Sequence, residues 1–452
     1  MWPPRVTATG PTAPEDNARM NAWNHLIDLW CQLPLVWRAS LLAVVGLLGA
    51  QQINRAIDRL AYRPRGRDPW LPAPEGLPSR KWSDRLPLWG WWSLRRESSF
   101  HGRWFWLRPL LIELLFPVAV AGLYLFEVRG GLYPVHGPVA SVDVLHAQFA
   151  LHALLIALMT VATFIDFDEQ TIPDEVTLLG TVAGLSWVSL LPVSLLPTIV
   201  SVGYVPYAHH VVLTTATYQP EWKAGLGGPQ SWPPWCDTSS ALVVALVCIF
   251  AWWLAALPKV WTMRRGIGRA FQFAAASVVR YRTWRLPSFS ALVMAMVALI
   301  AYGRGGWYWQ ACFSSVIGMV AAGGFTWTIR LVASHALATE ALGFGDVTLM
   351  AMIGAFLGWQ TSLLVFGLAP MTALLIAVLQ WILTRRHDIA FGPYLCLAAV
   401  VWIVAWQRLW YGWAVTAFAM GWILLAVLAL SVIMLGTLLW IWQMIKSLAG
   451  GR

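Results

Sequence analysis

Long apolar runs, each bounded by polar or charged residues, follow one another along most of this chain. About 20 apolar residues are needed to cross the hydrocarbon core of a bilayer, so runs of this length predict membrane-spanning helices. Eleven such runs are expected to be spans. Two of them begin at Val347 and at Phe391, and the nine others are given at the end of this paragraph. The sequence therefore predicts an all-α polytopic integral membrane protein. The other spans are expected at residues 35–52, 109–127, 146–165, 176–198, 240–258, 287–302, 307–330, 359–384 and 413–443.

The composition supports a membrane protein and argues against a soluble protein and against a nucleic-acid-binding protein. Of the 452 residues, 58% are hydrophobic, only 12% are charged and 31 are tryptophan, which is far from the composition of soluble proteins. We interpret most of the tryptophans as anchors at the membrane boundary. The net charge of +10 is attributed to cytoplasmic loops, so no nucleic-acid partner is expected. Residues 1–34 lack the apolar core of a signal peptide, so the first span is expected to be retained.

The distribution of basic residues predicts which loops face the cytoplasm. The loop that follows the first span is crowded with arginines as far as Arg108, and the segment 259–285 is also basic. Lys223, by contrast, is the only lysine or arginine between Ser201 and Ser239, so that segment is expected outside the cell. The number of spans between the two acidic motifs described next is even. Both motifs are therefore expected on the cytoplasmic face.

Two acidic motifs stand at the ends of apolar runs. Asp346 follows Gly343 and Gly345 at the start of one such run. A charged side chain within a membrane costs about 2.5–3.5 kcal/mol on insertion scales, so an acid at this place is expected to be functional. The glycines can take positive φ and let another backbone approach the carboxylate closely. Residues 165–174 hold a comparable acid, Asp166, and the two acids are expected to form a catalytic pair.

Three motifs, in this order, resemble those of the prepilin peptidases, the bacterial members of the GxGD aspartyl proteases. They are Asp166 followed by Ile172-Pro173-Asp174, the stretch Glu340 to Val347 with its Gly-Phe-Gly-Asp, and Ile389-Ala390-Phe391-Gly392-Pro393-Tyr394. The resemblance runs with interruptions from about residue 36 to about residue 406. It implies an aspartyl endopeptidase that needs no metal and no cofactor for proteolysis. The catalytic acids would be Asp166 and Asp346, supported by Asp174, Gly343 and Gly345.

Three aspartates compete for the first catalytic position. In the family pattern the catalytic acid stands seven residues before the proline, and Asp166 stands at that distance from Pro173. Asp174 follows the proline and precedes an apolar helix, so it is also expected to cap that helix. Asp168 is expected to be solvated.

The resemblance also implies a substrate and a place of action. The substrate would be the leader of a type IV prepilin or of a type II secretion pseudopilin, cut after a glycine that precedes a hydrophobic helix. The expected partners are this substrate and membrane lipid. The expected location is the bacterial inner membrane, which the chain crosses several times, with the active site facing the cytoplasm.

The cytoplasmic loop is similar to the family's N-terminal methyltransferase region at residues 86–95 and 108–114. Many members carry two CxxC pairs there, a spacing suited to zinc, whereas this loop has no cysteine. Either the loop folds without metal, or it keeps only a structural role. S-adenosylmethionine would serve methyl transfer, which we expect to be weak or absent. The five scattered cysteines predict neither a zinc site nor a disulfide framework, and His146 and His152 are expected to be packed or interfacial side chains.

The chain carries added segments relative to the family, and other functions remain open. A presenilin-like intramembrane protease would share the GxGD motif, but its Tyr-Asp and Pro-Ala-Leu motifs are missing from the expected places. A non-catalytic scaffold for secretion or pilus assembly is a second alternative. A transporter would place its acids nearer mid-membrane. The expected regions are a polar segment 1–34, a first-span and loop region 35–128, the two halves of the peptidase core 129–200 and 306–407, an insertion 201–305, and an extra helix in 408–452.

Overall fold

The helices group into two compact units, Met1–Pro173 and Asp174–Arg452, and each is described by itself. The predicted outer loop 201–239 and the basic segment 259–285 lie largely outside the described residues, so their sidedness stays a prediction. The computed structural model describes residues 25–63, 65–73, 75–134, 140–197, 210–212, 223–225, 234–257, 272, 276, 278, 280, 283–337, 339, 341–384, 390–419 and 422–449.

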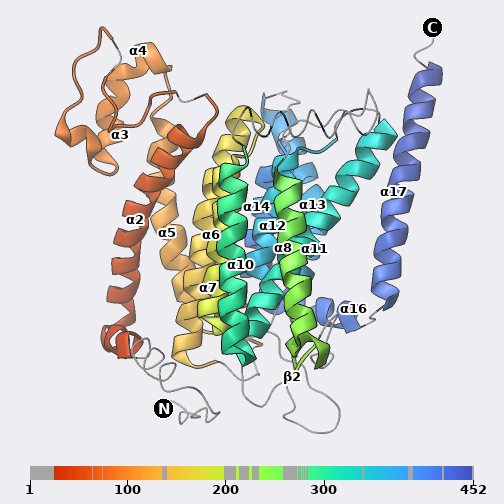
Figure 1. The fold of residues 1–452 in the computed structure, drawn as a ribbon. Helices are drawn as coiled ribbons and strands as arrows, with labels where there is room; N and C mark the ends of the chain where they lie inside the picture. Colours follow the sequence, from red (N-terminus) through yellow and green to blue (C-terminus); the bar gives the residue numbers. More distant parts are fainter. Residues whose placement is uncertain are drawn as a thin grey trace. The chain divides into compact units, whose positions relative to one another are not determined.

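Three long helices form the frame of the first unit. They are α2 (Leu35–Leu60), α5 (Leu107–Val128) and α6 (Val142–Glu169), and each packs against the other two (Figure 1). The close approach of α2 to α5 depends on a glycine, because a Cβ atom added to Gly46 would lie 3.0 Å from the Cα atom of Pro117. A bulkier residue at this position of α2 would push the two helices apart.

The segment between α2 and α5 is folded rather than extended. It has a small core of Trp91, Leu94 and Phe105. This arrangement gives the predicted cytoplasmic loop a defined structure of its own. Its elements are the 3-10 helices η1 (Trp82–Arg85) and η2 (Arg95–Glu97) and the helices α3 (Trp89–Leu94) and α4 (Ser98–His101).

Buried ion pairs hold this loop together. The carboxylate of Glu97 is fully buried and accepts hydrogen bonds from Nε and Nη2 of Arg80 at 2.9 and 2.7 Å. Asp84 is equally buried and accepts from Oγ of Ser93 at 2.6 Å and from Arg96. Burial acts to raise the pKa of Asp84, but hydrogen bonds from Arg96 and Ser93 outweigh it and hold the pKa below its usual value. Paired charges thus provide the cross-links of a loop that has no cysteine.

Glu113 ties the loop to both neighbouring helices. Its carboxylate projects from α5 and accepts the backbone N–H of Leu88 at 2.6 Å and the indole N–H of Trp91 at 2.8 Å, both from the loop. It also accepts the side-chain amide of Asn54 from α2 at 3.2 Å. Glu113 is only 1% exposed, and these three donors compensate for the water that its carboxylate has lost.

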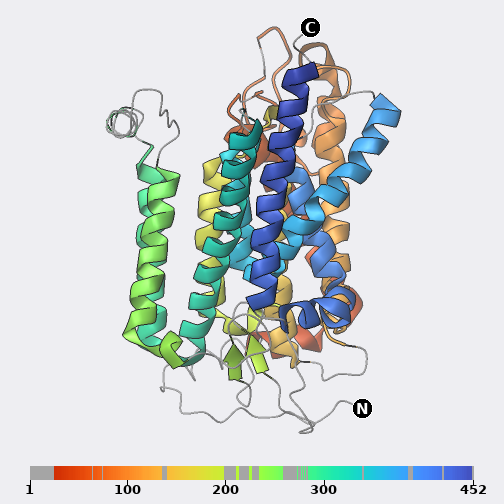
Figure 2. The same ribbon diagram turned by 90° about the vertical axis from the view of Figure 1, so that its right-hand side faces the viewer.

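The second unit is built around α11 (Gly306–Leu337), which packs against α7 (Asp174–Leu190) and α12 (Phe344–Leu357) (Figure 1). Its outer helices α8 (Ser239–Ala256) and α10 (Arg285–Arg304) lie side by side (Figure 2). Two three-residue strands, β1 (His210–Val212) and β2 (Lys223–Gly225), pair in parallel. The remaining elements are α13 (Trp359–Thr384), α14 (Gly392–Val404), α15 (Trp406–Leu409), the π-helix η5 (Trp410–Ala414), α16 (Val415–Ala419), α17 (Trp422–Ala449) and the 3-10 helices η3 (Pro192–Ser194) and η4 (Pro234–Asp237).

Helix α12 is buried on every side from Asp346 to its end. Its contact with α11 is made by two glycines, since a Cβ atom added to Gly318 or to Gly354 would lie 2.2 Å from the carbonyl oxygen of the other. On α7, a Cβ atom added to Gly184 would lie 2.4 Å from the ring of Phe356. Backbone therefore meets backbone where α12 crosses α11, and the position of α12 leaves no room for adjustment.

The C-terminal part of the second unit contains a sharp bend. Helix α14 and the helical segment that follows it are inclined at 78° to each other. Just after the bend, Nε1 of Trp406 and Oη of Tyr411 both donate to the carbonyl oxygen of Pro197, each at 3.0 Å. Helix α17 then runs along α11 (Figure 2), with Gly436 close to Val332.

The predicted helical membrane architecture is confirmed, and the chain is a multi-pass membrane protein. Among the described residues, seven helices are long and apolar enough to cross a membrane, or eight if the bent pair counts as one span. This is fewer than the expected eleven because α7 has 17 residues, α12 has 14, and the described apolar part of α13 ends at Leu375. These three helices nevertheless lie where the apolar runs predict helices.

Candidate active site

Asp346 is the third residue of α12 and is buried, with 8% of its surface exposed. The N-terminus of a helix favours a negative charge, because its first N–H groups lack partners within the helix. The proposed positive φ of the glycines is wrong in this structure. Gly343 precedes the helix with φ −69° and Gly345 lies inside it, and neither is among the described glycines with positive φ. A Cβ atom added to Gly343 would lie 3.6 Å from Oδ2 of Asp346, so this glycine leaves space beside the carboxylate.

Asp166 lies near the C-terminal end of α6 and is 5% exposed. The helix ends at Glu169, and Gln170 takes the left-handed conformation with φ +54°. Its N–H donates to the carbonyl oxygen of Asp166 at 2.8 Å, which closes the last turn. Asp174 is the first residue of α7, where an acid suits the helix dipole, and its predicted role as the helix cap stays a prediction.

The structure corrects the expectation that Asp168 is solvated. Its side chain is 19% exposed, and both of its carboxylate oxygens are paired with Arg108 of α5. Nη1 of Arg108 lies 2.7 Å from Oδ1 and Nη2 lies 2.8 Å from Oδ2, the two-pronged geometry in which Arg binds a carboxylate best. Arg65 approaches the same carboxylate at 3.5 Å.

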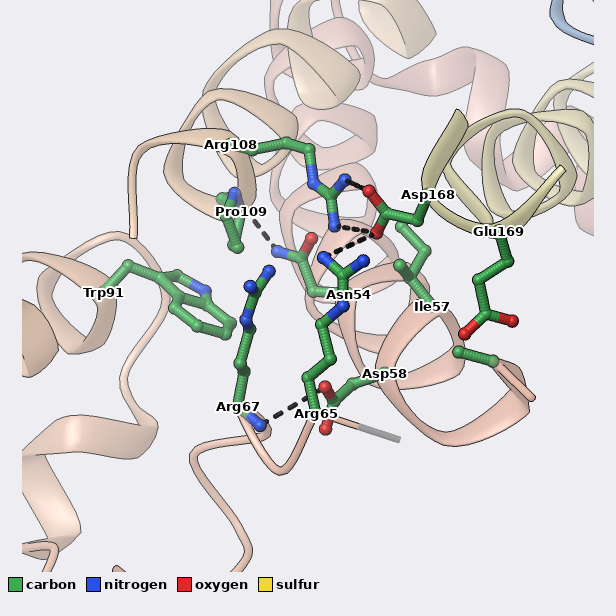
Figure 3. A pocket seen from close by; sticks show the side chains of 11 residues that line it. Asn54, Ile57, Asp58, Arg65, Arg67, Trp91, Arg108, Pro109, Asp168 and Glu169 are labelled. Carbon is green, nitrogen blue, oxygen red and sulfur yellow. Dashed lines mark hydrogen bonds and ion pairs between the residues drawn. The ribbon is translucent and has the colours of Figure 1, made fainter. Parts of the chain in front are cut away.

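A pocket of the first unit opens beside this ion pair (Figure 3). In Figure 3, Arg65 and Arg67 run side by side into the pocket, and Arg108 enters from the opposite side. Burial and the nearby cations Arg65 and Arg108 lower the pKa of Arg67. The pocket is lined by Asn54, Ile57, Asp58, Ala61, Arg65, Arg67, Trp91, Arg108, Pro109, Asp168 and Glu169.

Two of the carboxylates beside this pocket accept hydrogen bonds from backbone N–H groups. Asp58 accepts the N–H groups of Arg67 and Asp68 at 3.2 and 3.1 Å. Glu169 accepts those of Tyr62 and Arg63 at 2.7 and 2.9 Å. The start of the loop between α2 and α5 is therefore bonded both to the end of α2 and to the end of α6.

The predicted histidines are packed side chains, as expected. His146 is bonded to the hydroxyl of Tyr124 at 3.0 Å, and His152 lies 2.9 Å from a carboxylate oxygen of Glu127. No three His, Cys, Asp or Glu side chains in the described part of the chain are grouped so that they could hold a metal ion.

The pairing of the two predicted catalytic acids stays a prediction. Asp166 belongs to the unit that ends at Pro173, and Asp346 belongs to the unit that begins at Asp174. Each unit thus carries one of the two predicted catalytic acids, buried near the end of a helix.

Comparison with known proteins concerns Asp346, the second of the two predicted catalytic acids. Residues 267–379 match the model of the type IV leader peptidase family. This stretch contains Asp346 together with Gly343 and Gly345. The resemblance to the prepilin peptidases is confirmed. Asp166 lies outside the matched stretch, so its assignment still depends on its spacing from Pro173.

Relatives of known function support the prepilin peptidase match. Over 127 residues the chain is 32% identical to the prepilin leader peptidase/N-methyltransferase of Escherichia coli (strain K12), covering 28% of this chain and 56% of the relative. Over 125 residues it is 31% identical to the protein of the same name from Pseudomonas aeruginosa, covering 26% of this chain and 42% of the relative. The matched stretches thus span about half of these relatives or less. No solved structure matches the chain.

Sequence reasoning missed the residues that hold the end of α6. Arg108 was noted for its place at the end of the arginine-rich loop and for the resemblance of its segment to the methyltransferase region, and Glu169 and Gln170 had no predicted role. The signal that could have found Arg108 is its position, since a cation that begins an apolar helix can reach an acid that ends a neighbouring one.

Proposed function

We propose that this chain is a membrane-embedded aspartyl endopeptidase that cleaves the leader of type IV prepilins or of secretion pseudopilins. The match of residues 267–379, which includes Asp346, to the type IV leader peptidase family carries this proposal. The relatives are named for the same activity, although the chain matches only part of each.

The proposed mechanism uses Asp166 and Asp346 as one unit. Two carboxylates that share a small, partly dehydrated space carry a single proton between them. The ionised member takes a proton from a water molecule as that water attacks the scissile carbonyl carbon. The protonated member donates its proton to the carbonyl oxygen, and the proton taken from the water then passes from the other member to the departing amine. As the C–N bond breaks, the tetrahedral intermediate returns a proton to the pair, which restores its starting state. These steps require neither a metal ion nor a covalent intermediate.

The proposed place of action is the cytoplasmic face of the bacterial inner membrane. The arginine-rich loop before Arg108 supports this orientation. In a cysteine-free background, a cysteine in place of the exposed Phe100 should be labelled only after the cells are permeabilised. A cysteine at Gly227, in the predicted outer loop, should be labelled on intact cells. The opposite pattern would reverse the orientation.

Methyl transfer is proposed to be weak or absent in this chain. The relatives are named N-methyltransferases as well as peptidases, so S-adenosylmethionine is the cofactor to test. The loop of this chain, however, has no cysteine that could serve as a zinc ligand, and its buried carboxylates Glu97 and Asp84 are paired with arginines. Mass spectrometry of the mature substrate tests the proposal. A fully methylated N-terminus produced by this enzyme alone would contradict it.

Cleavage of a co-expressed prepilin in bacterial membranes tests the main proposal. The wild-type chain should shorten the prepilin at the glycine before its hydrophobic helix, and Asp346→Asn, present in the membrane at the same level, should not. Because Asn keeps the shape but cannot share the proton, loss of cleavage would identify the carboxylate as essential. Absence of cleavage by the wild-type chain would favour the scaffold alternative.

A further inference from the structure

Arg108 contacts α6 at two points, one helical turn apart. Its guanidinium lies over the ring of Phe164, 5.5 Å from the ring centre, and also forms the two-pronged pair with Asp168. Figure 3 shows this pair between the start of α5 and the end of α6. Asp166 stands midway between the two contacted residues in the sequence.

Helix geometry converts these contacts into a direction for Asp166. Successive residues of an α-helix are about 100° apart, so residues four apart share a face and residues two apart point to opposite sides. Phe164 and Asp168 therefore face Arg108, while Asp166 faces away from it. A rotation of the end of α6 would change the direction of the Asp166 side chain. Because Phe164 and Asp168 are both held, this rotation is prevented.

The cytoplasmic loop holds the same turn from another side. Glu169 accepts two backbone N–H groups from residues 62 and 63, and Arg65 lies 3.5 Å from Asp168. The left-handed Gln170 closes the helix on the carbonyl oxygen of Asp166. The last turn of α6 is thus fixed by α5, by the loop and by its own termination.

We propose that Arg108 and Asp168 are positioning residues for proteolysis, which set the direction of the Asp166 carboxylate and link the cytoplasmic loop to the catalytic centre. This inference rests on the function proposed above. It gives the loop a role in cleavage that does not depend on methyl transfer.

The exposure of the ion pair argues for positioning rather than for overall stability. The side chains of Arg108 and Asp168 are 31% and 19% exposed, and ion pairs this accessible contribute little to the stability of a fold. A misplacement of about 1 Å at a catalytic group, however, can cost about 100-fold in rate. Loss of the pair is therefore expected to act on kcat.

The test measures prepilin cleavage by the purified full-length chain in detergent and lipid. Arg108→Gln and Asp168→Asn should each lower kcat by about 10-fold to 100-fold with KM within about twofold. Arg108→Lys should recover little, because Lys lacks the two-pronged geometry, and Asp168→Glu should recover part. The matched control is Arg59→Gln, which removes another half-exposed arginine paired with an acid, Asp68, and should leave kcat unchanged.

The pH dependence of kcat separates positioning from general damage. Arg108→Gln leaves an unbalanced negative charge near Asp166 and should move the acid limb of the profile to higher pH. Asp168→Asn leaves an unbalanced positive charge and should move it to lower pH. The charged groups around this turn are Asp168 and Glu169 of α6, Arg108 of α5, Arg65 and Arg67 of the loop, and Asp58 of α2.

The outcomes distinguish this inference from the proposed function. If the wild-type chain cleaves prepilin and Asp166→Asn is inactive, but Arg108→Gln and Asp168→Asn have wild-type kcat, the inference is wrong and the function stands. Reduced kcat in both variants with unmoved pH profiles would also overturn it, since that pattern reports damage to the fold. Absence of cleavage by the wild-type chain would contradict both the proposed function and this inference.

Discussion

The end of α6 and the start of α12 carry the two predicted catalytic acids, yet they are held by different kinds of contact. Around Asp166 the contacts are polar, with an Arg–Asp pair and carboxylate bonds to loop backbone. Behind Asp346 they are apolar, with a helix buried along its length and a glycine-to-glycine crossing. The end of α6 is therefore held mainly by charged groups, whereas α12 is held mainly by close packing, with Arg330 donating to the carbonyl oxygen of Leu342 just before the helix begins.

The electrostatics of the two helix ends explains part of this difference. Asp346 stands at a helix N-terminus, where the unpaired backbone N–H groups favour negative charge. Asp166 and Asp168 stand in the last turns of α6, where carbonyl groups disfavour negative charge. Cations are needed there, and Arg108 and Arg65 supply them.

The largest expected effect comes from removing either acid. Asp166→Asn should abolish cleavage, as expected for Asp346→Asn, while Asp174→Asn should retain it. If the two acids act as one unit, the double variant should be no worse than either single variant. Processing of a co-expressed prepilin, followed by immunoblotting, measures all four. Cleavage by Asp166→Asn together with its loss in Asp174→Asn would move the first catalytic position to Asp174.

A side chain at the glycine crossing should disrupt the second unit. Gly354→Leu or Gly318→Leu forces carbon atoms into a carbonyl oxygen and should cost about 3 kcal/mol or more. Thermal unfolding of the purified protein in detergent measures this. The matched control is Gly324→Leu on α11, where an added Cβ atom meets nothing within 4 Å. Equal stability of the Gly318 and Gly324 variants would show that the helices do not cross so closely.

Breaking the buried ion pair of the loop should unfold the loop locally. Glu97→Gln leaves Arg80 buried without its carboxylate, and such a loss typically costs about 3–5 kcal/mol. Hydrogen exchange of residues 80–106 should then accelerate. Glu75→Gln changes an exposed acid of the same loop and should alter stability by no more than about 0.5 kcal/mol. Unchanged exchange in Glu97→Gln would mean that the pair is dispensable.

Lowering the pH should destabilise the loop between α2 and α5, because it protonates Asp84. The pKa of Asp84 is lower in the folded state than in the unfolded chain, so its contribution is complete above the unfolded pKa, near 4. That contribution is lost as the pH falls through the folded value. Loop protection from hydrogen exchange should therefore decrease as the pH falls below about 4. Asp84→Asn should remove this pH step, and its persistence in the variant would assign it to another carboxyl group.

The smallest expected effect concerns the end of α6. Gln170 adopts a left-handed conformation that costs a residue with a side chain about 1 kcal/mol relative to glycine. Gln170→Gly should therefore stabilise the end of the helix by up to about 1 kcal/mol, without loss of cleavage. Hydrogen exchange at residues 166–170 measures the change, and destabilisation would indicate that the Gln side chain contributes a contact of its own.

The sequence predicted the helices well because the membrane imposes long apolar runs. The span expected at 287–302, for example, is observed as α10, Arg285–Arg304. Contacts between distant polar residues carry no such periodic signal. Arg108 and Asp168 are 60 residues apart, and Asp168 therefore looked like a solvated acid. The identity of the two acids came from motifs and spacing, and whether they meet remains a prediction.

The bonds that Trp406 and Tyr411 make to Pro197 have a consequence for the order of folding. They join residues 209 and 214 positions apart, so they cannot form until most of the chain has been synthesised. Ordering so long an intervening segment makes such contacts late events. The carbonyl group of Pro197, which lies beyond η3, must therefore wait for its partners while α8, α10, α11, α12, α13 and α14 insert. The second unit is completed from its C-terminal side.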